Sequence, residues 1–250
     1  MRIGPAFSQI ATAFSMFRPR SYGSSHSDRL ETFYSEQSSG YDLFRDRLLQ
    51  GRNELVQSLH IPEGGKLLDL GAGTGRNLEW IAPRLGSLEK VVLVDLSPSL
   101  LSVARDRILA HGWQNVEVCL NDATTYKPPE GEHEGFDAII LSYSLSMMPN
   151  WFDAIDRAHA LLKPEGQLGV VDFYVSDKWP SEGFVKHSAF MRFFWPAWFS
   201  YTNVLINSDH LTYLHRRFER VALAERMTKV PFLLGLEAPY YIFVGRKKVS

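Results

Sequence analysis

The order of hydrophobic and polar residues between 66 and 175 predicts strands alternating with helices. Short runs rich in Val, Leu and Ile, typical of buried strands, recur at 66–70, 90–96, 116–122, 136–143 and 166–175. Apolar residues at helical spacing predict helices at 76–85, 98–112 and 151–162. This alternation favours a parallel sheet with helices on both faces. Two later runs, 220–230 and 239–248, are predicted to close the sheet as an antiparallel pair.

Two segments depart from this alternation of strands and helices. The pattern is helical over 28–60, and residues 178–215 form a long insert in which aromatic side chains are concentrated. Within a dozen positions the insert carries Phe190, Phe193, Phe194, Trp195, Trp198, Phe199 and Tyr201. Such an insert can pack on the domain as a lid, and Trp and Tyr also favour membrane interfaces. We divide the chain into an N-terminal segment, 1–30, and one domain, 31–250.

The N-terminal segment has the pattern of an amphipathic helix. Apolar side chains recur at helical spacing at Ile3, Phe7, Ile10, Phe14 and Phe17. No acidic residue precedes Asp28, and polar residues interrupt the apolar positions, which argues against a secretory signal. Three interpretations stay open: a helix in a membrane interface, a helix packed on its own domain, or an organelle presequence.

Composition narrows the classes of function. A chain of 250 residues is long enough for one sizeable α/β domain with additions, or for two small domains. Its net charge of −1 provides no general attraction for nucleic acid. The single Cys119 excludes an intramolecular disulfide and a Cys-rich zinc site, and it fits a reducing compartment. No apolar run is long enough to span a bilayer. We therefore predict no metal site and a cytoplasmic location.

The segment KLLDLGAGTGRN joins the first strand to the first helix through Gly71, Gly73 and Gly75. Glycine has no Cβ, so this loop can adopt positive φ and leave room for a ligand near a helix N-terminus. It lacks the sixth-position glycine of dinucleotide sites and the Gly-Lys-Ser/Thr ending of a P-loop. Asp69, an acceptor-only anion before the first glycine, suits a cationic amino group.

Acidic residues also lie at the ends of the second and third strands. Ligands of such sheets bind at the carboxyl ends of the strands, where Asp95 could accept from two ribose hydroxyls and Asp122 from an adenine amine. Each acid alone could simply cap the following helix or turn. Three acids that end three successive strands beside one glycine loop favour a cofactor site.

These motifs resemble those of class I S-adenosylmethionine-dependent methyltransferases, from about residue 41 to the closing strands. The resemblance implies a Rossmann-like α/β fold with a seven-stranded, mostly parallel sheet whose last two strands form a hairpin. It implies that Gly71 and Gly73 back the methionine moiety of S-adenosyl-L-methionine. Asp95 would then take the ribose hydroxyls and Asp122 the adenine amine. The predicted cofactor-binding set also includes Tyr41, Arg52, Asp69, Ala72, Asn77, Leu96, Ala123 and Ser142.

Other stretches bear on the methyl acceptor. The chain lacks the Asn/Asp-Pro-Pro-aromatic motif of base methylases and the paired glutamates of protein-arginine enzymes, so we expect no nucleic-acid partner. The stretches YDLFRDRLLQGRNEL, SYSLSMMPNW, RFFWPAWFSYTNV and VPFLLGLEAPYYIFVGRK resemble the betaine-lipid branch, N-methyltransferases that convert diacylglyceryl homoserine to its trimethyl form.

This finer resemblance implies a lipid substrate, a peripheral position on a membrane surface, and a separate aminocarboxypropyl transferase for the preceding step. Two alternatives stay open. One is methylation of phosphatidylethanolamine, another small amine or a quinone. The other is a non-catalytic cofactor-binding partner, because a fold alone does not guarantee chemistry.

The predicted catalytic residues lie near the ends of the fourth and fifth strands. Asp172 could orient an ammonium group, while Tyr143 and Tyr174 could offer ring faces to a methylated cation. Capping of the next turn is an equal alternative for Asp172. Arg45 and Arg52 could hold a carboxylate, or simply lie on a solvated helix face.

Overall fold

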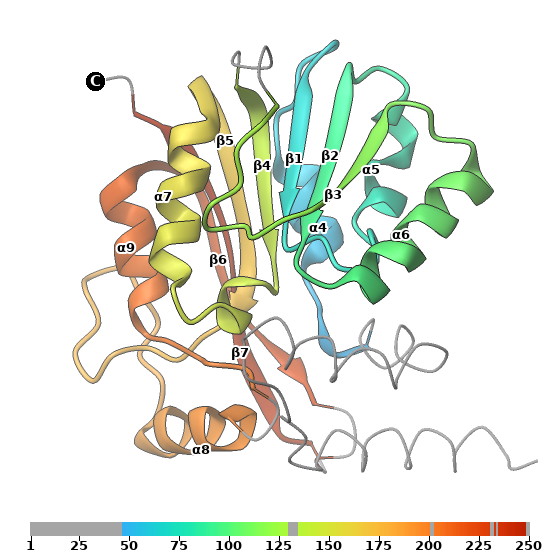
Figure 1. The fold of residues 1–250 in the computed structure, drawn as a ribbon. Coiled ribbons are helices and arrows are strands. Elements are labelled where there is room, and N and C mark those ends of the chain that lie inside the picture. Colours follow the sequence, from blue (N-terminus) through green and yellow to red (C-terminus); the bar gives the residue numbers. More distant parts are fainter. Residues whose placement is uncertain (1–46, 130–134, 201–202, 231–232, 234, 249–250) are drawn as a thin grey trace, which may run out of the picture.

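Figure 1 shows the computed structural model of the chain, which describes residues 47–129, 135–200, 203–230, 233 and 235–248. The N-terminal segment lies outside these residues, as do Tyr41 and Arg45, so the expectations for them stay predictions. Of the helical stretch expected over 28–60, the described part contains α4 (Arg52–Ser58).

The chain forms strands and helices in alternation. The first half contains β1 (Lys66–Leu70), α5 (Leu78–Leu85), β2 (Lys90–Asp95), α6 (Pro98–His111) and β3 (Val116–Leu120). The second half contains β4 (Phe136–Ser142), the 3-10 helix η1 (Leu145–Met147), α7 (Trp151–Leu161), β5 (Leu162–Phe173), α8 (Ala189–Ser200), α9 (Asp209–Arg217), β6 (Phe218–Lys229) and β7 (Glu237–Lys247). Each element predicted between 66 and 175 is present, with ends that differ by a few residues. The strand β5 begins earlier than expected because Leu162 pairs with Phe136 ahead of a register shift.

Seven strands of the described chain form one sheet in the order β3-β2-β1-β4-β5-β7-β6. β1 runs parallel to both β2 and β4, and β5 runs parallel to β4. β7 is antiparallel to both β5 and β6, which confirms the predicted closing hairpin. The strand order reverses between β1 and β4, and ligands of open α/β sheets bind outside the carboxyl ends of the strands at such a point.

Helices bury both faces of the sheet, as Figure 1 shows. On one face Leu67 belongs to the hydrophobic core that includes α4, α5 and buried residues of α8. On the other face its neighbour Leu68 belongs to the core formed with α7 and α9. Successive side chains of a strand point to opposite faces, so burial on both faces requires continuous apolar strands. This is why the strands in the sequence are apolar runs rather than alternating ones.

The aromatic insert lies at the carboxyl end of the parallel strands. α8 is near the lower end of β4 and β5 in Figure 1, and Phe199 of α8 packs 4.7 Å from the ring of Phe173 at the end of β5. Trp195 and Phe199 are almost fully buried. Part of the insert therefore packs on the domain core, and it does so beside the end of the sheet where ligands bind.

Candidate cofactor site

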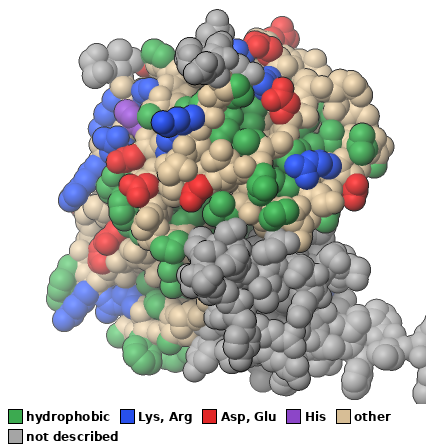
Figure 2. Space-filling model, viewed as in Figure 1, with side chains coloured by type: hydrophobic (Ala, Val, Ile, Leu, Met, Phe, Trp, Pro, Cys, Tyr) green, Lys and Arg blue, Asp and Glu red, His purple; other side chains and the backbone are tan. Residues whose placement is uncertain are grey.

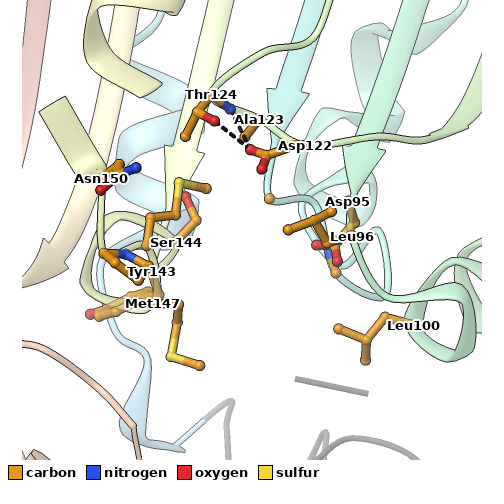
Figure 3. A pocket seen from close by; sticks show the side chains of 14 residues that line it. Asp95, Leu96, Leu100, Asp122, Ala123, Thr124, Tyr143, Ser144, Met147 and Asn150 are labelled. Atoms are coloured by element: carbon orange, nitrogen blue, oxygen red, sulfur yellow. Dashed lines mark hydrogen bonds between the residues drawn. The ribbon is translucent and has the colours of Figure 1, made fainter. Parts of the chain in front are cut away.

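A cavity opens at the carboxyl ends of β1 to β4 (Figure 3). Six predicted cofactor residues line it: Gly71, Gly73, Asp95, Leu96, Asp122 and Ala123. Asp95 and Leu96 face Ser144 and Met147 across the gap, with the loop that follows β3 at the upper edge of the view. The cavity thus lies where the strand order reverses.

The glycine loop is shaped for close approach. Gly71 has φ +76°, and a Cβ there would lie 2.5 Å from the Cβ of Ser144. Gly71 N–H donates to the carbonyl of Val94 at 2.8 Å, which ties the loop to β2. Gly73, with φ +57°, borders the cavity. A side chain at Gly71 would strain the backbone and occupy the space between the loop and Ser144.

The Asp95 carboxylate is fixed at the rim by two backbone groups. Gly73 N–H donates to Oδ2 at 2.8 Å, and Ser97 N–H donates to Oδ1 at 2.9 Å. A carboxylate oxygen has more than one lone-pair direction and can accept more than one hydrogen bond. The arrangement suits the vicinal hydroxyls of a ribose.

Asp122 is oriented by its own turn. Its Oδ1 accepts from the N–H of Thr124 at 2.8 Å and from the Thr124 hydroxyl at 2.7 Å (Figure 3). Both contacts use Oδ1, and together they fix the orientation of the whole carboxylate group, including Oδ2. Thr124 lines the cavity and was missed by the sequence reasoning, although an Asp followed two positions later by Thr is a recognisable turn signal.

Asp69 lies beneath the glycine loop rather than in the lining. Asn77 Nδ2 donates to Oδ2 at 2.8 Å, while Oδ1 is buried with no hydrogen-bond partner among the described residues. Burial raises the pKa of Asp69 to about 7; the Asn77 hydrogen bond opposes this shift. A buried carboxylate oxygen without a partner, next to a glycine cradle, fits a ligand that carries a positive charge. These features, with Asp95 and Asp122, fit S-adenosylmethionine.

Three further predicted cofactor residues, Ala72, Ser142 and Arg52, are not part of the cavity lining. Ala72 is buried behind the glycines, and Ser142 ends β4 with a buried hydroxyl that has no hydrogen-bond partner among the described residues. Arg52 is buried at the start of α4, where its guanidinium lies 4.9 Å from the ring of Trp80 and its Nε donates to the Leu49 carbonyl. Arg52 thus lies on a packed helix face and not a solvated one.

Tyr143 is the one predicted catalytic residue that lines the cavity. Its backbone has φ +52°, its hydroxyl donates to the carbonyl of Gln50 at 2.6 Å, and its ring lies 4.8 Å from that of Phe173. Burial, reinforced by the nearby Asp172, raises the pKa of Tyr143 well above its usual value. The side chain is therefore a neutral ring at physiological pH.

Asp172 and Tyr174 lie behind the cavity. Asp172 is fully buried; Ser146 N–H donates to Oδ2 at 3.0 Å and Phe173 N–H donates to Oδ1 at 2.8 Å. Burial raises the pKa of Asp172 to about 6 against these hydrogen bonds. The Tyr174 hydroxyl donates to Glu225. In the structure these two side chains support their neighbours, and a catalytic role for either stays a prediction.

The wall of the cavity opposite Asp95 comes from the segment after β4. Its lining residues are Tyr143, Ser144, Met147, Met148, Pro149 and Asn150. Sequence reasoning named Tyr143 and used this stretch for the betaine-lipid resemblance, but it did not identify the other five residues as lining. Methionines in a loop give no local signal of a ligand site. The wall offers a ring, two thioethers and small polar groups, with no charged side chain.

Comparisons with known proteins agree with this geometry. Residues 67–166 match the family described as "Methyltransferase domain". A ubiquinone/menaquinone biosynthesis C-methyltransferase of Hydrogenovibrio crunogenus is 29% identical over 151 residues, 58% of each chain. The namesake of Pseudomonas fluorescens is 32% identical over 149 residues, 57% of each chain. The match thus spans less than two thirds of the length of these relatives.

Solved structures share the fold. Phosphoethanolamine N-methyltransferase 2 of Haemonchus contortus, in complex with S-adenosyl-L-methionine, has a TM-score of 0.65 at 16% identity, covering 91% of this chain and 61% of that one. An N-methyltransferase of Bradyrhizobium japonicum has a TM-score of 0.55 at 17% identity, covering 84% and 98%.

The fold and the matched segment point to the same class of protein. Residues 67–166 match a methyltransferase domain, and the described chain has the Rossmann-like seven-stranded sheet that the solved methyltransferases share. None of the four names just given specifies a betaine lipid.

Proposed function

We propose that the chain is an N-methyltransferase that converts diacylglyceryl homoserine to diacylglyceryl-N,N,N-trimethylhomoserine by three successive methylations. The observation that carries the proposal is the uncharged wall of the cavity after β4, which packed aromatic rings join to α8. The ring centre of Tyr143, which lines the cavity, lies 4.8 Å from the ring centre of Phe173. The ring centre of Phe173 lies 4.7 Å from that of Phe199 of α8. These rings are buried, so they join the cavity wall to α8 by packing. An uncharged wall beside this apolar core suits an acceptor that carries acyl chains.

The rim of the cavity would hold the cofactor. Gly71 and Gly73 leave room beside the backbone, and Asp95 and Asp122 present fixed carboxylates. When bound, S-adenosylmethionine supplies a methyl group on a positively charged sulfur, which leaves as a neutral thioether. The acceptor nitrogen attacks as the neutral amine, so one proton leaves it for solvent before each transfer. The protein's own contribution is then chiefly to orient the acceptor.

The wall after β4 suits an amine that ends as a permanent cation. Among the described lining residues the only carboxylates, Asp95 and Asp122, belong to the cofactor side. The Tyr143 hydroxyl already donates to Gln50, so what this residue offers an acceptor is its ring. A ring face and methionine sulfurs attract a methylated ammonium that can no longer donate a hydrogen bond.

The proposal includes the partners expected from the sequence. The lipid would be presented at a membrane surface, with the protein bound peripherally on the cytoplasmic side. A separate aminocarboxypropyl transferase would make the homoserine lipid. Within the described residues, no helix has the length and apolar character needed to cross a bilayer.

Quinone methylation is the second candidate, since both curated relatives named above are quinone C-methyltransferases. An uncharged wall of Tyr143, Met147 and Met148 would also accommodate a quinone ring. The two proposals differ in the atom that is methylated, nitrogen in one and carbon in the other, so the product distinguishes them.

The test is methylation by the purified full chain with labelled S-adenosylmethionine. Three acceptors are offered separately in detergent micelles: diacylglyceryl homoserine, phosphatidylethanolamine and a demethylated quinone. We expect label only in the homoserine lipid, with the trimethyl form identified by mass spectrometry. Asp95→Ala should lower labelling of every acceptor at limiting cofactor by about ten- to a hundredfold, because it weakens cofactor binding by about 1.5–3 kcal/mol. Label in the quinone or phosphatidylethanolamine alone would overturn the betaine-lipid proposal and leave the cofactor site intact.

A further inference from the structure

The helix α8 is apolar on two opposite sides. Trp195 and Phe199 are 1% and 2% exposed and pack on the domain core. Phe190 and Phe193, three positions apart and so on one face of the helix, are 59% and 79% exposed. Packing on the core explains the first pair of aromatic residues and not the second.

The loop before α8 adds a further exposed ring with cations beside it. Trp179 is 74% exposed, and the ammonium groups of Lys178 and Lys186 lie 5.5 and 4.4 Å from the centre of its ring. Figure 2 shows hydrophobic side chains gathered at the lower left, where Figure 1 places α8, with Lys and Arg side chains close to them. We call Trp179, Phe190 and Phe193, with Lys178 and Lys186, the docking face.

The segment that carries the docking face has both positive and negative side chains. Electrostatic attraction is therefore a smaller contribution to membrane binding than the apolar contacts. The segment 177–200 carries three cations, Lys178, Lys186 and Arg192, against two acids, Asp177 and Glu182. α8 itself contains no acidic residue. Exposed Trp and Phe rings with lysines beside them are the composition of a segment that lies in a membrane interface.

The docking face lies at the same end of the molecule as the cofactor cavity. The buried side of α8 contacts Phe173, and Phe173 contacts Tyr143 in the cavity lining. A lipid could therefore place its headgroup in the cavity while its acyl chains stay in the bilayer beneath α8.

We propose that the docking face binds the surface of a lipid bilayer that contains anionic headgroups. Phe190, Phe193 and Trp179 enter the interface between headgroups and acyl chains, and Lys178 and Lys186 contact the anionic headgroups. This assignment rests on the proposed function only for the identity of the lipid that is methylated. Vesicle binding can be measured without any turnover.

The test is flotation of the full chain with vesicles of phosphatidylcholine alone or of phosphatidylcholine mixed with phosphatidylglycerol. Phe190→Ser combined with Phe193→Ser should weaken binding to both vesicles by about tenfold or more, because two rings no longer leave water. Lys178→Gln with Lys186→Gln should weaken binding only to the anionic vesicles and only at low salt. Matched controls are Leu109→Ser, 78% exposed on α6, and Lys248→Gln near the C-terminus; both should float like the parent.

Two outcomes would overturn the proposal that the docking face binds a bilayer surface. One is equal flotation of the Phe190→Ser, Phe193→Ser variant and the parent. The other is a parent that ignores vesicles but forms dimers that this variant lacks, which would assign the face to a second copy. The substituted side chains are exposed, so thermal melting should report an intact fold. Flotation without methylation of the homoserine lipid would instead reject the proposed function and leave the docking face as a membrane-binding surface.

Discussion

Asp69 shows how a single side chain can prepare a site for a positively charged ligand. One of its oxygens accepts from Asn77, and the other is buried with no hydrogen-bond partner in the described part of the chain. Burial therefore raises its pKa from 3.8 to about 7. In the absence of ligand, the folded protein binds a proton at Asp69 that the unfolded chain releases above pH 3.8.

This shift predicts a pH dependence of stability. The contribution of Asp69 is fully present below pH 3.8 and is lost as pH rises toward 7, at about 1.4 kcal/mol per pH unit. Buried His210, whose pKa is lowered to about 3, acts in the opposite sense, so the quantity to measure is the difference between parent and Asp69→Asn. Between pH 6 and pH 7, above the pKa of Asp172, urea unfolding should show the parent losing stability relative to Asp69→Asn.

S-adenosylmethionine should reduce this difference, because a cationic amino group near Asp69 favours the charged carboxylate. A difference that stays constant with pH would show that Asp69 titrates normally in the fold. A pH-dependent difference that the cofactor does not change would place Asp69 away from the cationic group.

Elements with local signals could be predicted from the sequence, and those fixed by distant contacts could not. α6 begins at a Ser97 cap whose hydroxyl accepts from Leu100 N–H, and it ends at Gly112 in the left-handed conformation. Both are signals within the helix's own sequence. By contrast, the 3-10 helix η1 and the positive φ of Tyr143 depend on contacts with Asp172 and Gln50 from other parts of the chain.

The same distinction, between local signals and distant contacts, explains which residues of the candidate site could be predicted from the sequence. Gly71, Asp95 and Asp122 were predicted because each lies at the carboxyl end of a recognisable strand. Met147 and Met148 were missed because nothing near them in the sequence indicates a ligand wall. In α8 nearly every position is apolar or aromatic, so the sequence could not separate the buried Trp195 from the exposed Phe193.

The short helix η1 gives a prediction about Asp172. Its carboxylate accepts from the N–H groups of Ser146 and Phe173, and the carbonyl of Ser146 accepts in turn from Leu205 N–H at 2.6 Å. Asp172→Asn leaves one of the two N–H donors without an acceptor. Unfolding by urea should report a loss of stability of about 1–3 kcal/mol.

The pH–rate profile separates anchoring from catalysis. If Asp172 only anchors η1, the kcat profiles of parent and Asp172→Asn should have the same shape, even where the rates differ. Direct action on the acceptor amine would instead show as an ionisation near pH 6 in the parent that the variant lacks, since burial raises the pKa of Asp172 to about 6. That result, with unchanged stability, would restore the catalytic role predicted from the sequence.

At the scale of the whole molecule, the fold separates three tasks around one end of the sheet. On the proposed function, Asp95 at the end of β2 and Asp122 after β3 would hold the cofactor, the uncharged wall after β4 would face the acceptor, and α8 would carry part of the docking face. This separation matters for a reaction in which the same nitrogen is methylated three times. Its final product is a permanent cation that can no longer donate a hydrogen bond.

The last prediction distinguishes the acceptor wall from the docking face by the products that accumulate. Tyr143→Leu removes the ring face, worth about 0.5–2 kcal/mol to a methylated cation, so it should slow the later methylations most and leave mono- and dimethyl lipid. Tyr143→Phe keeps the ring, loses only the hydrogen bond to Gln50, and should retain the parent ratio of products. Phe190→Ser with Phe193→Ser should slow all three steps alike on vesicles, because it limits access to the bilayer and not the handling of charge. Mass spectrometry of timed reactions measures these ratios. Equal ratios for Tyr143→Leu and the parent would remove the ring of Tyr143 from the acceptor site.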